Sequence, residues 1–455
     1  MTMEESTGAV SAAGILARLE RIPVGRWHGM MRTIMGIGLI FDAFDLLTIA
    51  FTLPAMVGPW HLAQSTIGWV ISAAFFGQFL GALVAGAVAE RVGRLPVITA
   101  AIALFSVMSL ACALAWDGSS LITFRFLQGV GLGAEVPIAN IYILEFARTD
   151  VRGRFYILYQ MIFAFGLIAA GLLGYLMVPS IGWRSMFYLG TVPIVVVFLI
   201  RWKLPESPRW LVSKGRLAEA DAAVAQIERA ITAQGRALPP PVVRPAPARQ
   251  ATRWSEIFEG VYRHRTFAMW AMWFCCFSTT YGLQTWLPTL YRTEFHLPLA
   301  QSLLYGFITQ CCGLLANGVC AFTIDRTGRR PWFLFAFIGG GITMLTLTLI
   351  GPSTATLLLV FTSLGGFFMS TGAIGLNLYT SELYPTRVRA FGAAVGGSWQ
   401  RVAAFTGPLV VGYLSPIYGL GAIFVYFGGL ALLGGVVTYG WADETKGRTL
   451  EEVSP

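Results

Sequence analysis

Charged residues are scarce in this chain. Of its 455 residues only 12% are Asp, Glu, Lys or Arg, whereas 56% are hydrophobic. A soluble domain carries about 25% charged residues, so the composition excludes an ordinary soluble protein. The net charge of +9 raises the alternative of a nucleic-acid-binding protein, which depends on where the basic residues lie.

Histidine and cysteine are scarce as well. The chain has four histidines, and no two of them stand at a metal-binding interval. The six cysteines show no Cys-x-x-Cys spacing and lie in apolar runs, where a free cysteine behaves as a small hydrophobe. We therefore expect no metal site and no cofactor, and, since no nucleophile–base constellation appears, no enzymatic activity. The cysteines are Cys112, Cys275, Cys276, Cys311, Cys312 and Cys320.

No cleavable signal peptide is visible in the sequence. Residues 1–32 are polar and basic, and the first apolar run after them is long enough to cross a bilayer by itself. We expect residues 1–32 to remain as a segment before the first span.

Long apolar runs make up most of the chain. Twelve stretches reach the roughly 20 residues that a transmembrane helix needs. The sequence therefore predicts an all-α membrane protein with twelve transmembrane helices. The predicted spans are residues 33–58, 66–89, 95–115, 120–144, 155–178, 184–203, 266–290, 302–324, 331–351, 353–381, 390–414 and 418–441.

The basic residues alternate along the connections between these spans. One set of connections is rich in arginine, whereas the other set holds only Arg184 and Arg292. Because Lys and Arg are retained on the cytoplasmic side, we predict that both termini are cytoplasmic. Topology then explains the positive charge, which leaves nucleic-acid binding without support.

Residues 204–265 form the one long polar segment. Leu217–Ile231 has helical periodicity, and Ala237–Arg249 is proline-rich, which predicts a linker. Trp254–Tyr262 predicts an amphipathic helix on the inner face. Because the segment shows no apolar pattern large enough for a core, we expect no catalytic domain there.

The two halves of the chain repeat each other. Three markers of the first half recur in the second half at nearly the same spacing, which predicts two pseudo-symmetric six-helix bundles with a substrate site between them. The markers are Glu90–Arg94 with Asp325–Arg329, Glu145 and Arg152 with Glu382 and Arg389, and Glu206 with Glu444. The predicted divisions are an N-terminal segment (1–32), an N-terminal bundle (33–203), a cytoplasmic linker with short helices (204–265), a C-terminal bundle (266–441) and a tail (442–455).

These markers resemble the signature of the major facilitator superfamily, over essentially the whole chain. Gly86–Arg94 is similar to the loop motif between helices 2 and 3 of that superfamily, with Glu90 where Asp is usual. Pro205–Leu211 and Glu444–Glu452 resemble the sugar-porter branch and its relatives. The resemblance implies the superfamily's fold and transport by alternating access.

A narrower resemblance is to the metabolite:proton symporters, which include bacterial nicotinate and aromatic-acid carriers and are related to organic ion transporters. It rests on Phe41–Leu47, Arg125–Glu135 and Tyr281–Pro288. Aromatic-acid symporters tend to carry Gly where this chain has Glu135, which favours the nicotinate-type members.

An aspartate and an arginine within the spans are predicted to lie at the same depth. At 1.5 Å per residue, Asp45 lies about 20 Å and Arg125 about 21 Å above the cytoplasmic edge of a core about 30 Å thick. Such a pair forms a proton switch, because ionised Asp45 holds Arg125 and protonated Asp45 releases it. The resemblance implies this coupling role for both residues. The alternative is a static ion pair that fixes the register of the helices.

Two further acidic residues are candidates for proton coupling. Asp42 lies nearly on the same helix face as Asp45, where it shares the proton, contacts substrate or instead caps a kink. Glu135 lies about 15 Å below Arg125, just before Pro137. It suits a second proton site or a gate toward the cytoplasm. The alternative is a hydrogen bond to groups that the proline frees.

Arg401 is the leading candidate for substrate binding. It lies roughly 18 Å along helix 11, near the midplane, where a guanidinium suits a carboxylate held by two parallel hydrogen bonds. A structural pair with a neighbouring helix is the alternative. Aromatic rings and amides on other spans suit a small flat anion, although each also suits interhelical packing. These candidates are Tyr156, Tyr159, Gln160, Gln284, Trp286, Gln310, Asn317, Asn377, Tyr379, Trp399 and Gln400.

Charged residues at the predicted cytoplasmic ends of the spans form a separate system. We expect them to pair across helix ends, to hold the inner side shut and to separate when it opens. The alternative is that they only set the topology. They are Glu90, Arg91, Arg94, Glu145 and Arg152 in the first half, and Asp325, Arg326, Arg329, Glu382 and Arg389 in the second.

The predicted function is proton-coupled import of a small, nicotinate-like organic carboxylate by a monomer in the bacterial plasma (inner) membrane. The expected partners are the organic acid, protons and the lipid bilayer. One alternative is an organic-cation or drug:proton antiporter that uses Asp42 and Glu135 as cation ligands. Another is a transporter-like receptor that binds its ligand without moving it.

Overall fold

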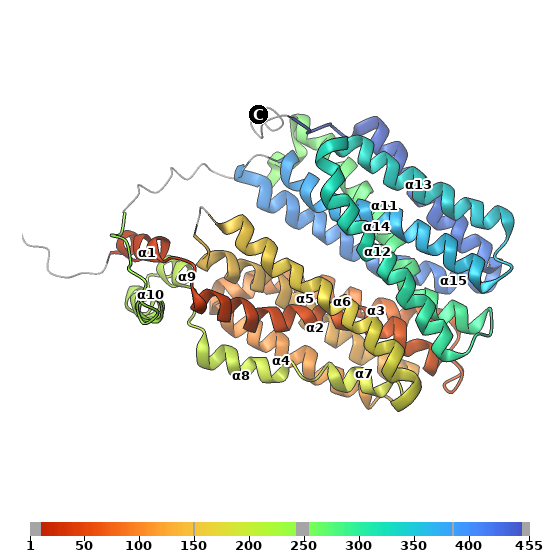
Figure 1. Cartoon of the computed structure of the whole chain (residues 1–455), viewed down its shortest axis with the longest axis horizontal. Helices are drawn as coiled ribbons and strands as arrows, with labels where there is room; N and C mark the ends of the chain where they lie inside the picture. The colour runs from red at the N-terminus through yellow and green to blue at the C-terminus, as the bar shows by residue number, and fades with distance from the viewer. Residues whose placement is uncertain (1–10, 149–150, 243–253, 385, 448–455) are drawn as a thin grey trace, which may run out of the picture.

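The computed structural model describes residues 11–148, 151–242, 254–384 and 386–447, which form helices and no strand. The first bundle, here the N half, consists of α2 (Arg26–Met56), α3 (Gln64–Val92), α4 (Arg94–Ala113), α5 (Gly118–Phe146), α6 (Arg152–Ile181), α7 (Arg184–Leu189) and α8 (Ile194–Lys203). The second, the C half, consists of α11 (Gly260–Thr293), α12 (Leu299–Thr327), α13 (Arg329–Ile350), α14 (Ala355–Leu383) and α15 (Thr386–Trp441). Outside them lie α1 (Ala12–Arg21), α9 (Pro208–Ser213), α10 (Leu217–Thr232) and the 3₁₀ helix η1 (Trp254–Phe258). Figure 1 shows the N half in red to yellow-green beside the C half in green to blue.

The number of membrane crossings agrees with the prediction. Ten segments in the described ranges are helical, long and apolar enough to cross a membrane, with α7 and α8 taken together as one. One of them lies in α15, which contains two predicted spans joined at Gly419, where φ of 76° and ψ of −178° are not helical. Dividing α15 there and adding α11, a 34-residue helix with more polar residues, gives the twelve predicted spans.

The buried side chains form one core shared by both halves and separate cores within each half. The shared core joins Phe51 to Leu287 and Val411. A second core, which includes Met31, belongs to the N half, and a third, which includes Trp273, belongs to the C half. We call the end that carries Arg94, Arg329 and α10 the basic face, and the other end the opposite face. The shared core lies toward the opposite face, and the separate cores lie toward the basic face.

Glycines set the distance between α3 and α5. A Cβ atom added at Gly129 would lie 2.0 Å from the carbonyl oxygen of Ala74, and one at Gly133 would lie 2.1 Å from that of Gln78. Only residues without a side chain at these two positions let the helices approach this closely. This approach places α5 deep in the N half, where Arg125 and Glu135 are buried.

Replacing Gly133 with Ala is expected to lower the melting temperature measurably. The added methyl group meets backbone rather than a flexible side chain, so α5 must shift, at a cost on the order of 1–3 kcal/mol. Gly86→Ala in the same helix pair is the matched control, because nothing lies within 4 Å of its added Cβ atom. Thermal unfolding of both purified variants in detergent tests this, and equal melting temperatures would contradict the packing role of Gly133.

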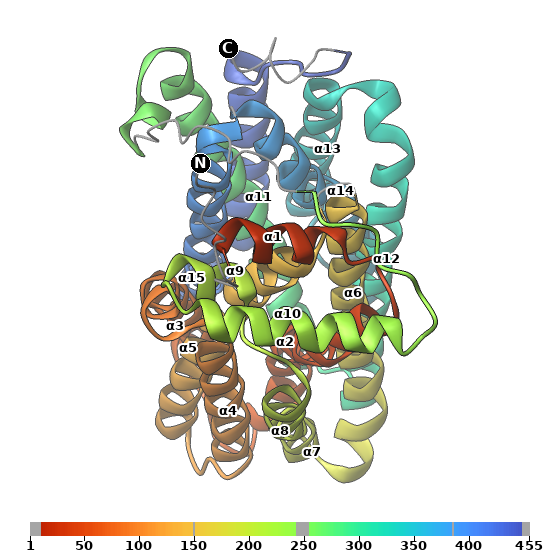
Figure 2. The ribbon, with the colours of Figure 1, turned by 90° about the vertical axis from the view of Figure 1, so that its left-hand side faces the viewer.

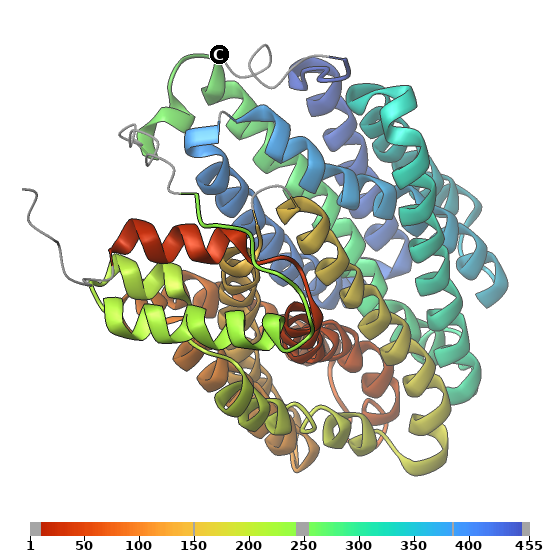
Figure 3. The same cartoon turned by 60° about the vertical axis from the view of Figure 1, so that its left-hand side comes forward.

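The linker helices α9 and α10 pack with α1 on the basic face (Figures 2 and 3). Arg18 forms ion pairs with Asp221 and with Glu228, the latter at 2.6 Å. Val224 and Ile227 of α10 are fully buried in the core of the N half. The helix predicted over Leu217–Ile231 is confirmed, but the expectation that this segment lacks a buried apolar pattern is wrong. The apolar stripe of α10 faces α1. Because the two helices lie far apart in the sequence, the sequence pattern does not show that they pack together.

The segment Trp254–Tyr262, predicted as one amphipathic helix, belongs to two different helices in the structure. Trp254–Phe258 forms the 3₁₀ helix η1, and Tyr262 already belongs to α11, which begins at Gly260. Most of the predicted proline-rich linker falls on residues 243–253, outside the described residues.

Candidate functional site

A chain of three buried polar side chains connects α2 to α5. The Arg125 guanidinium donates to Gln128 Oε1 at 2.9 Å, and Gln128 Nε2 donates to Asp45 Oδ2 at 2.7 Å. All three residues are at most 1% exposed. Asp45 and Arg125 are therefore at one depth, as predicted, but the expected direct ion pair is absent from this structure. The Gln128 amide joins them instead.

Gln128 was not among the predicted site residues. It lies three residues after Arg125, which places both side chains on one face of α5. The distance between Asp45 and Arg125 also depends on rotamers, which helical rise does not determine. The spacing of Gln128 from Arg125 is the sequence signal that identifies it in retrospect.

Two atoms of this chain have no hydrogen-bond partner among the described residues. They are Asp45 Oδ1 and Arg125 Nε, and both are buried. Asp45 Oδ1 lies beside Gly190, where an added Cβ atom would be 3.3 Å away. Gly190 begins the break between α7 and α8, so the span predicted as one helix over 184–203 is interrupted next to Asp45. Unsatisfied buried polar atoms are costly, and here they belong to the residues predicted to exchange a proton.

Asp42 of the N half and Arg401 of the C half lie close enough to interact electrostatically across the boundary between the halves. Each acts electrostatically on the other, although they make no direct ion pair. Arg401 Nε is buried, and the guanidinium makes no hydrogen bond to any described residue. A hydrogen-bonded pair between Arg401 and a neighbouring helix is thus absent among the described residues, which leaves its donors free for an anion. Asp42 lies within the continuous helix α2, which argues against its capping a kink.

Glu135 is buried and has no hydrogen-bond partner among the described residues. Both carboxylate oxygens are unsatisfied, and an added Cβ atom at Gly38 would lie 3.0 Å from Glu135 Oε1. The proposed hydrogen bond to groups freed by Pro137 is therefore absent here. Asp42 and Tyr159 lie close enough to interact electrostatically with Glu135, and the Tyr159 hydroxyl is also buried and unsatisfied.

The other predicted lining residues divide into two groups. Trp286 and Tyr379 are both 1% exposed, and the polar atom of each bonds to a main-chain carbonyl. Trp286 Nε1 donates to the Pro408 carbonyl at 3.0 Å, and the Tyr379 hydroxyl donates to the Asp443 carbonyl at 2.7 Å. Their rings fill core positions that the sequence pattern does not distinguish from a site.

The remaining lining candidates differ in burial and in hydrogen-bond partners. Gln400 donates to the Tyr281 hydroxyl at 3.2 Å, and Tyr281 interacts electrostatically with Arg401, so this pair adjoins the Arg401 site. Trp399 packs on Trp270, with ring centroids 5.4 Å apart. Asn377 is exposed and donates to a carbonyl of its own helix. Tyr156, Gln160, Gln284 and Asn317 are half-buried, and Gln310 is buried.

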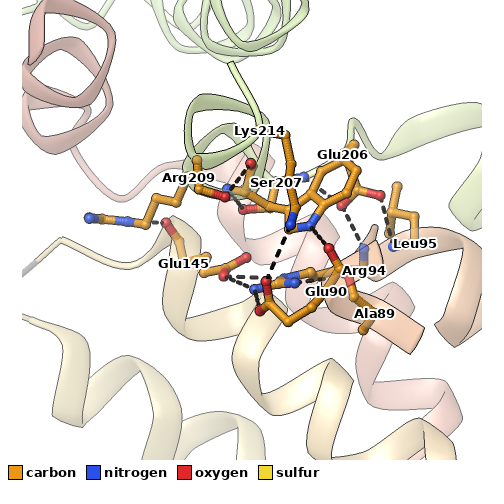
Figure 4. A network of polar contacts seen from close by, with 11 residues as sticks. Ala89, Glu90, Arg94, Leu95, Glu145, Glu206, Ser207, Arg209 and Lys214 are labelled. Atoms are coloured by element: carbon orange, nitrogen blue, oxygen red, sulfur yellow. Dashed lines mark hydrogen bonds and ion pairs between the residues drawn. The ribbon is translucent and has the colours of Figure 1, made fainter. Parts of the chain in front are cut away.

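Arg94 organises an ion-pair network on the basic face of the N half (Figure 4). Its guanidinium contacts Glu90 at 2.8 Å and Glu145 at 3.1 Å. Glu206 accepts hydrogen bonds from the backbone N–H groups of Arg94 and Leu95, both at 3.1 Å. The network joins α3, α4, α5 and the segment after α8, which places the first-half markers in one cluster.

The C half repeats this network with equivalent residues. Arg329 contacts Asp325 at 2.8 Å and Glu382 at 2.7 Å, and Glu444 accepts from the N–H of Arg329 at 2.9 Å. The predicted sequence repeat is thus a structural repeat. Both networks lie within one half, however, and in the described part of the chain no ion pair joins the halves on the basic face.

The other predicted gating residues lie outside these networks. Arg91 and Arg326 are exposed, and Arg152 Nε is buried without a hydrogen-bond partner among the described residues. The side chain of Arg389 lies outside the described residues.

The equivalent carboxylates Glu206 and Glu444 have different environments. Burial raises the pKa of Glu206, although backbone N–H groups at the start of α4 donate to it. Burial also acts to raise the pKa of Glu444, but backbone N–H groups, including those at the start of α13, outweigh it and the pKa is lowered. As the pH falls, Glu206 is therefore protonated before Glu444.

Contacts between the halves gather toward the opposite face. Trp69 Nε1 donates to the Tyr413 hydroxyl at 3.1 Å, and the rings of Phe75 and Tyr281 are 5.4 Å apart. Gly68 of α3 meets the backbone of α15 closely, since an added Cβ atom would lie 3.2 Å from the Pro408 carbonyl oxygen. Among the described residues, the halves therefore share a core toward the opposite face and have separate cores toward the basic face.

Comparison with known proteins adds family and fold. A family described as "Sugar (and other) transporter" matches residues 30–455. The niacin transporter NiaP of Acinetobacter baylyi is 33% identical over 442 residues, which cover 96% of this chain and 99% of that protein. The gallate transporter of Pseudomonas putida is 30% identical over 415 residues, with coverage of 90% and 91%.

Solved structures show the same fold. A crystal structure of a D-xylose-proton symporter matches with a TM-score of 0.70 and 20% sequence identity, covering 92% of this chain and 99% of that one. At this sequence identity the match shows the fold alone, an architecture of two six-helix bundles.

Proposed function

The chain belongs to the sugar (and other) transporter family of the major facilitator superfamily, and from this premise we propose that it imports a small aromatic carboxylate of the nicotinate type together with protons. It is a multi-pass membrane transporter and not an enzyme. The observation that carries the proposed substrate class is the Arg401 guanidinium, which is free of partners in the described part of the chain and adjoins Asp42.

The basic face is cytoplasmic in this proposal, because positive residues are retained on that side. The shared core toward the opposite face and the separate cores toward the basic face support an inward-facing state. Alternating access then requires that the contacts around Trp69 and Tyr413 separate while the halves approach each other on the basic face.

Substrate binding depends on competition for Arg401. The substrate carboxylate accepts two parallel hydrogen bonds from the guanidinium, while ionised Asp42 attracts the same cation. Protonation of Asp42 removes that competitor, so substrate and proton bind together more favourably than either alone. The relatives support this substrate class, since one is a niacin transporter and another a gallate transporter.

Proton binding at Asp45 changes the contact between α2 and α5 through Gln128. Ionised Asp45 accepts an N–H from the Gln128 amide, whose oxygen is then free to accept from Arg125. Protonated Asp45 donates instead, so the amide turns its oxygen toward Asp45 and its NH₂ group toward Arg125. Two donors then face each other and Arg125 is released. A hydrogen bond to a charged group is worth about 1.5–3 kcal/mol, enough to shift a two-state equilibrium by about tenfold or more.

A thermal-shift screen of purified protein tests the substrate class. Nicotinate at about 100 times its Kd is expected to stabilise the protein by about 2.7 kcal/mol. Nicotinamide, which has the same ring without the carboxylate, is the matched control and is expected to stabilise much less. Stabilisation by organic cations and not by carboxylates would contradict the proposal and favour the antiporter alternative, in which Asp42 and Glu135 bind the cation.

A further inference from the structure

A groove between α4 and α8 opens on the outer surface of the N half. It has a volume of about 540 Å³ and is lined by Pro96, Thr99, Ala100, Val197, Phe198 and Arg201. The spacing of these residues places the first three on one face of α4 and the last three on one face of α8. The two helices pack against each other along this line.

The groove lies at the depth where lipid head groups meet acyl chains. Arg94 begins α4 and Lys203 ends α8, so the lining residues occupy the turns nearest the basic face. Phe198 is 70% exposed and the adjacent Trp202 is 75% exposed. Large apolar side chains with this exposure, on helices that cross the membrane, face lipid, and Trp is typical of the membrane interface.

The polar end of the groove carries positive charge without a protein counter-ion. Arg201 is exposed and makes no hydrogen bond or ion pair with any described residue. The acidic residue at this end of α4, Glu206, already accepts N–H groups from Arg94 and Leu95.

We propose that this groove binds one anionic phospholipid. The phosphate accepts two parallel hydrogen bonds from the Arg201 guanidinium. The acyl chain follows the apolar wall of Val197, Phe198 and Ala100. Basic pockets between transmembrane helices near the cytoplasmic surface are suited to such head groups. This site is distinct from the Asp42–Arg401 site, and its existence does not depend on which substrate is transported.

Lipid binding by the purified protein tests the proposal. Phosphatidylglycerol is titrated into delipidated protein in detergent, with phosphatidylcholine of the same chain length as the zwitterionic comparison, and bound lipid is counted by native mass spectrometry. The wild type is expected to retain one phosphatidylglycerol preferentially, and Arg201→Gln to bind it about fivefold to tenfold more weakly. Arg154→Gln, which removes another exposed arginine of the basic face, is the matched control and is expected to bind like the wild type.

Two further measurements keep the result interpretable. The melting temperature of lipid-free Arg201→Gln is expected to equal that of the wild type, which shows that the variant folds. Inorganic phosphate at millimolar concentration is expected to leave the bound lipid in place. Equal binding of both lipids, unchanged binding by Arg201→Gln, or displacement of the lipid by inorganic phosphate would overturn the proposal.

Discussion

Replacing Asp45 with Asn is expected to abolish proton-driven accumulation of substrate while leaving substrate exchange intact. Asn has nearly the shape of Asp but does not ionise, so it fixes one state of the Asp45–Gln128–Arg125 chain. The carrier then still moves loaded with substrate, but the proton gradient no longer drives it. In proteoliposomes with an inward proton gradient we expect accumulation to fall to the equilibrium level, and counterflow of labelled nicotinate to stay within about threefold of the wild type.

Asp117→Asn is the matched control for this substitution. Asp117 caps the first turn of α5 by accepting from Ser120 N at 2.7 Å, and Asn caps helices equally well. Both accumulation and exchange are expected to remain. If Asp45→Asn accumulates substrate like the control, Asp45 does not couple the proton to transport.

Gln128→Leu separates the relay from a direct ion pair. Leu fills the space of the amide without a hydrogen bond, so protonation of Asp45 is no longer transmitted to Arg125. We expect uncoupled exchange that resembles Asp45→Asn. Full coupling in this variant would mean that Asp45 and Arg125 act on each other directly and that the amide only fills space.

Replacing Arg401 with Ala is expected to weaken substrate binding by about 100-fold, the largest effect on affinity in the site. Two hydrogen bonds between a guanidinium and a carboxylate contribute about 3 kcal/mol beyond what water supplies, and the loss appears in KM and in Kd. Arg401→Lys keeps the charge but not the parallel geometry, so we expect an intermediate loss of about tenfold.

The neutral analogue nicotinamide gives this prediction its internal control. Since it has no carboxylate, its weak binding is expected to be nearly the same in the wild type and in Arg401→Ala. A loss of affinity that is equal for nicotinate and nicotinamide would indicate a general defect of the binding region. Unchanged nicotinate affinity would remove Arg401 from the site.

The architecture could be predicted from the sequence because it depends on dimensions that vary little between membrane proteins. The rise of a helix and the thickness of the hydrocarbon core determine how many spans the apolar runs supply and which residues share a depth. The level of Asp45 with Arg125 is of this kind. So is the repeat of Arg94 as Arg329, since equivalent turns at Gly93 and Gly328, both with positive φ, recur where the spacing of the two markers predicts.

The rest depends on side-chain packing, which periodicity does not encode. Trp286 is of a residue type common in ligand-binding sites, but its indole N–H donates to the Pro408 carbonyl oxygen in the shared core. Gln128 connects two charges only because its rotamer points between them. The pairing of α1 with α10 joins segments about 200 residues apart, and neither segment alone shows which partner covers its apolar stripe.

Simultaneous measurement of proton and nicotinate entry into proteoliposomes tests the central claim most directly. The vesicles contain a pH-sensitive dye and no nicotinate at the start. Labelled nicotinate added outside is expected to acidify the lumen at the rate at which the label enters. The lumen is also expected to concentrate nicotinate above the external level when the outside is made acidic. Nicotinate entry with no accompanying proton entry, or lumenal alkalinisation on its addition, would contradict proton-coupled import.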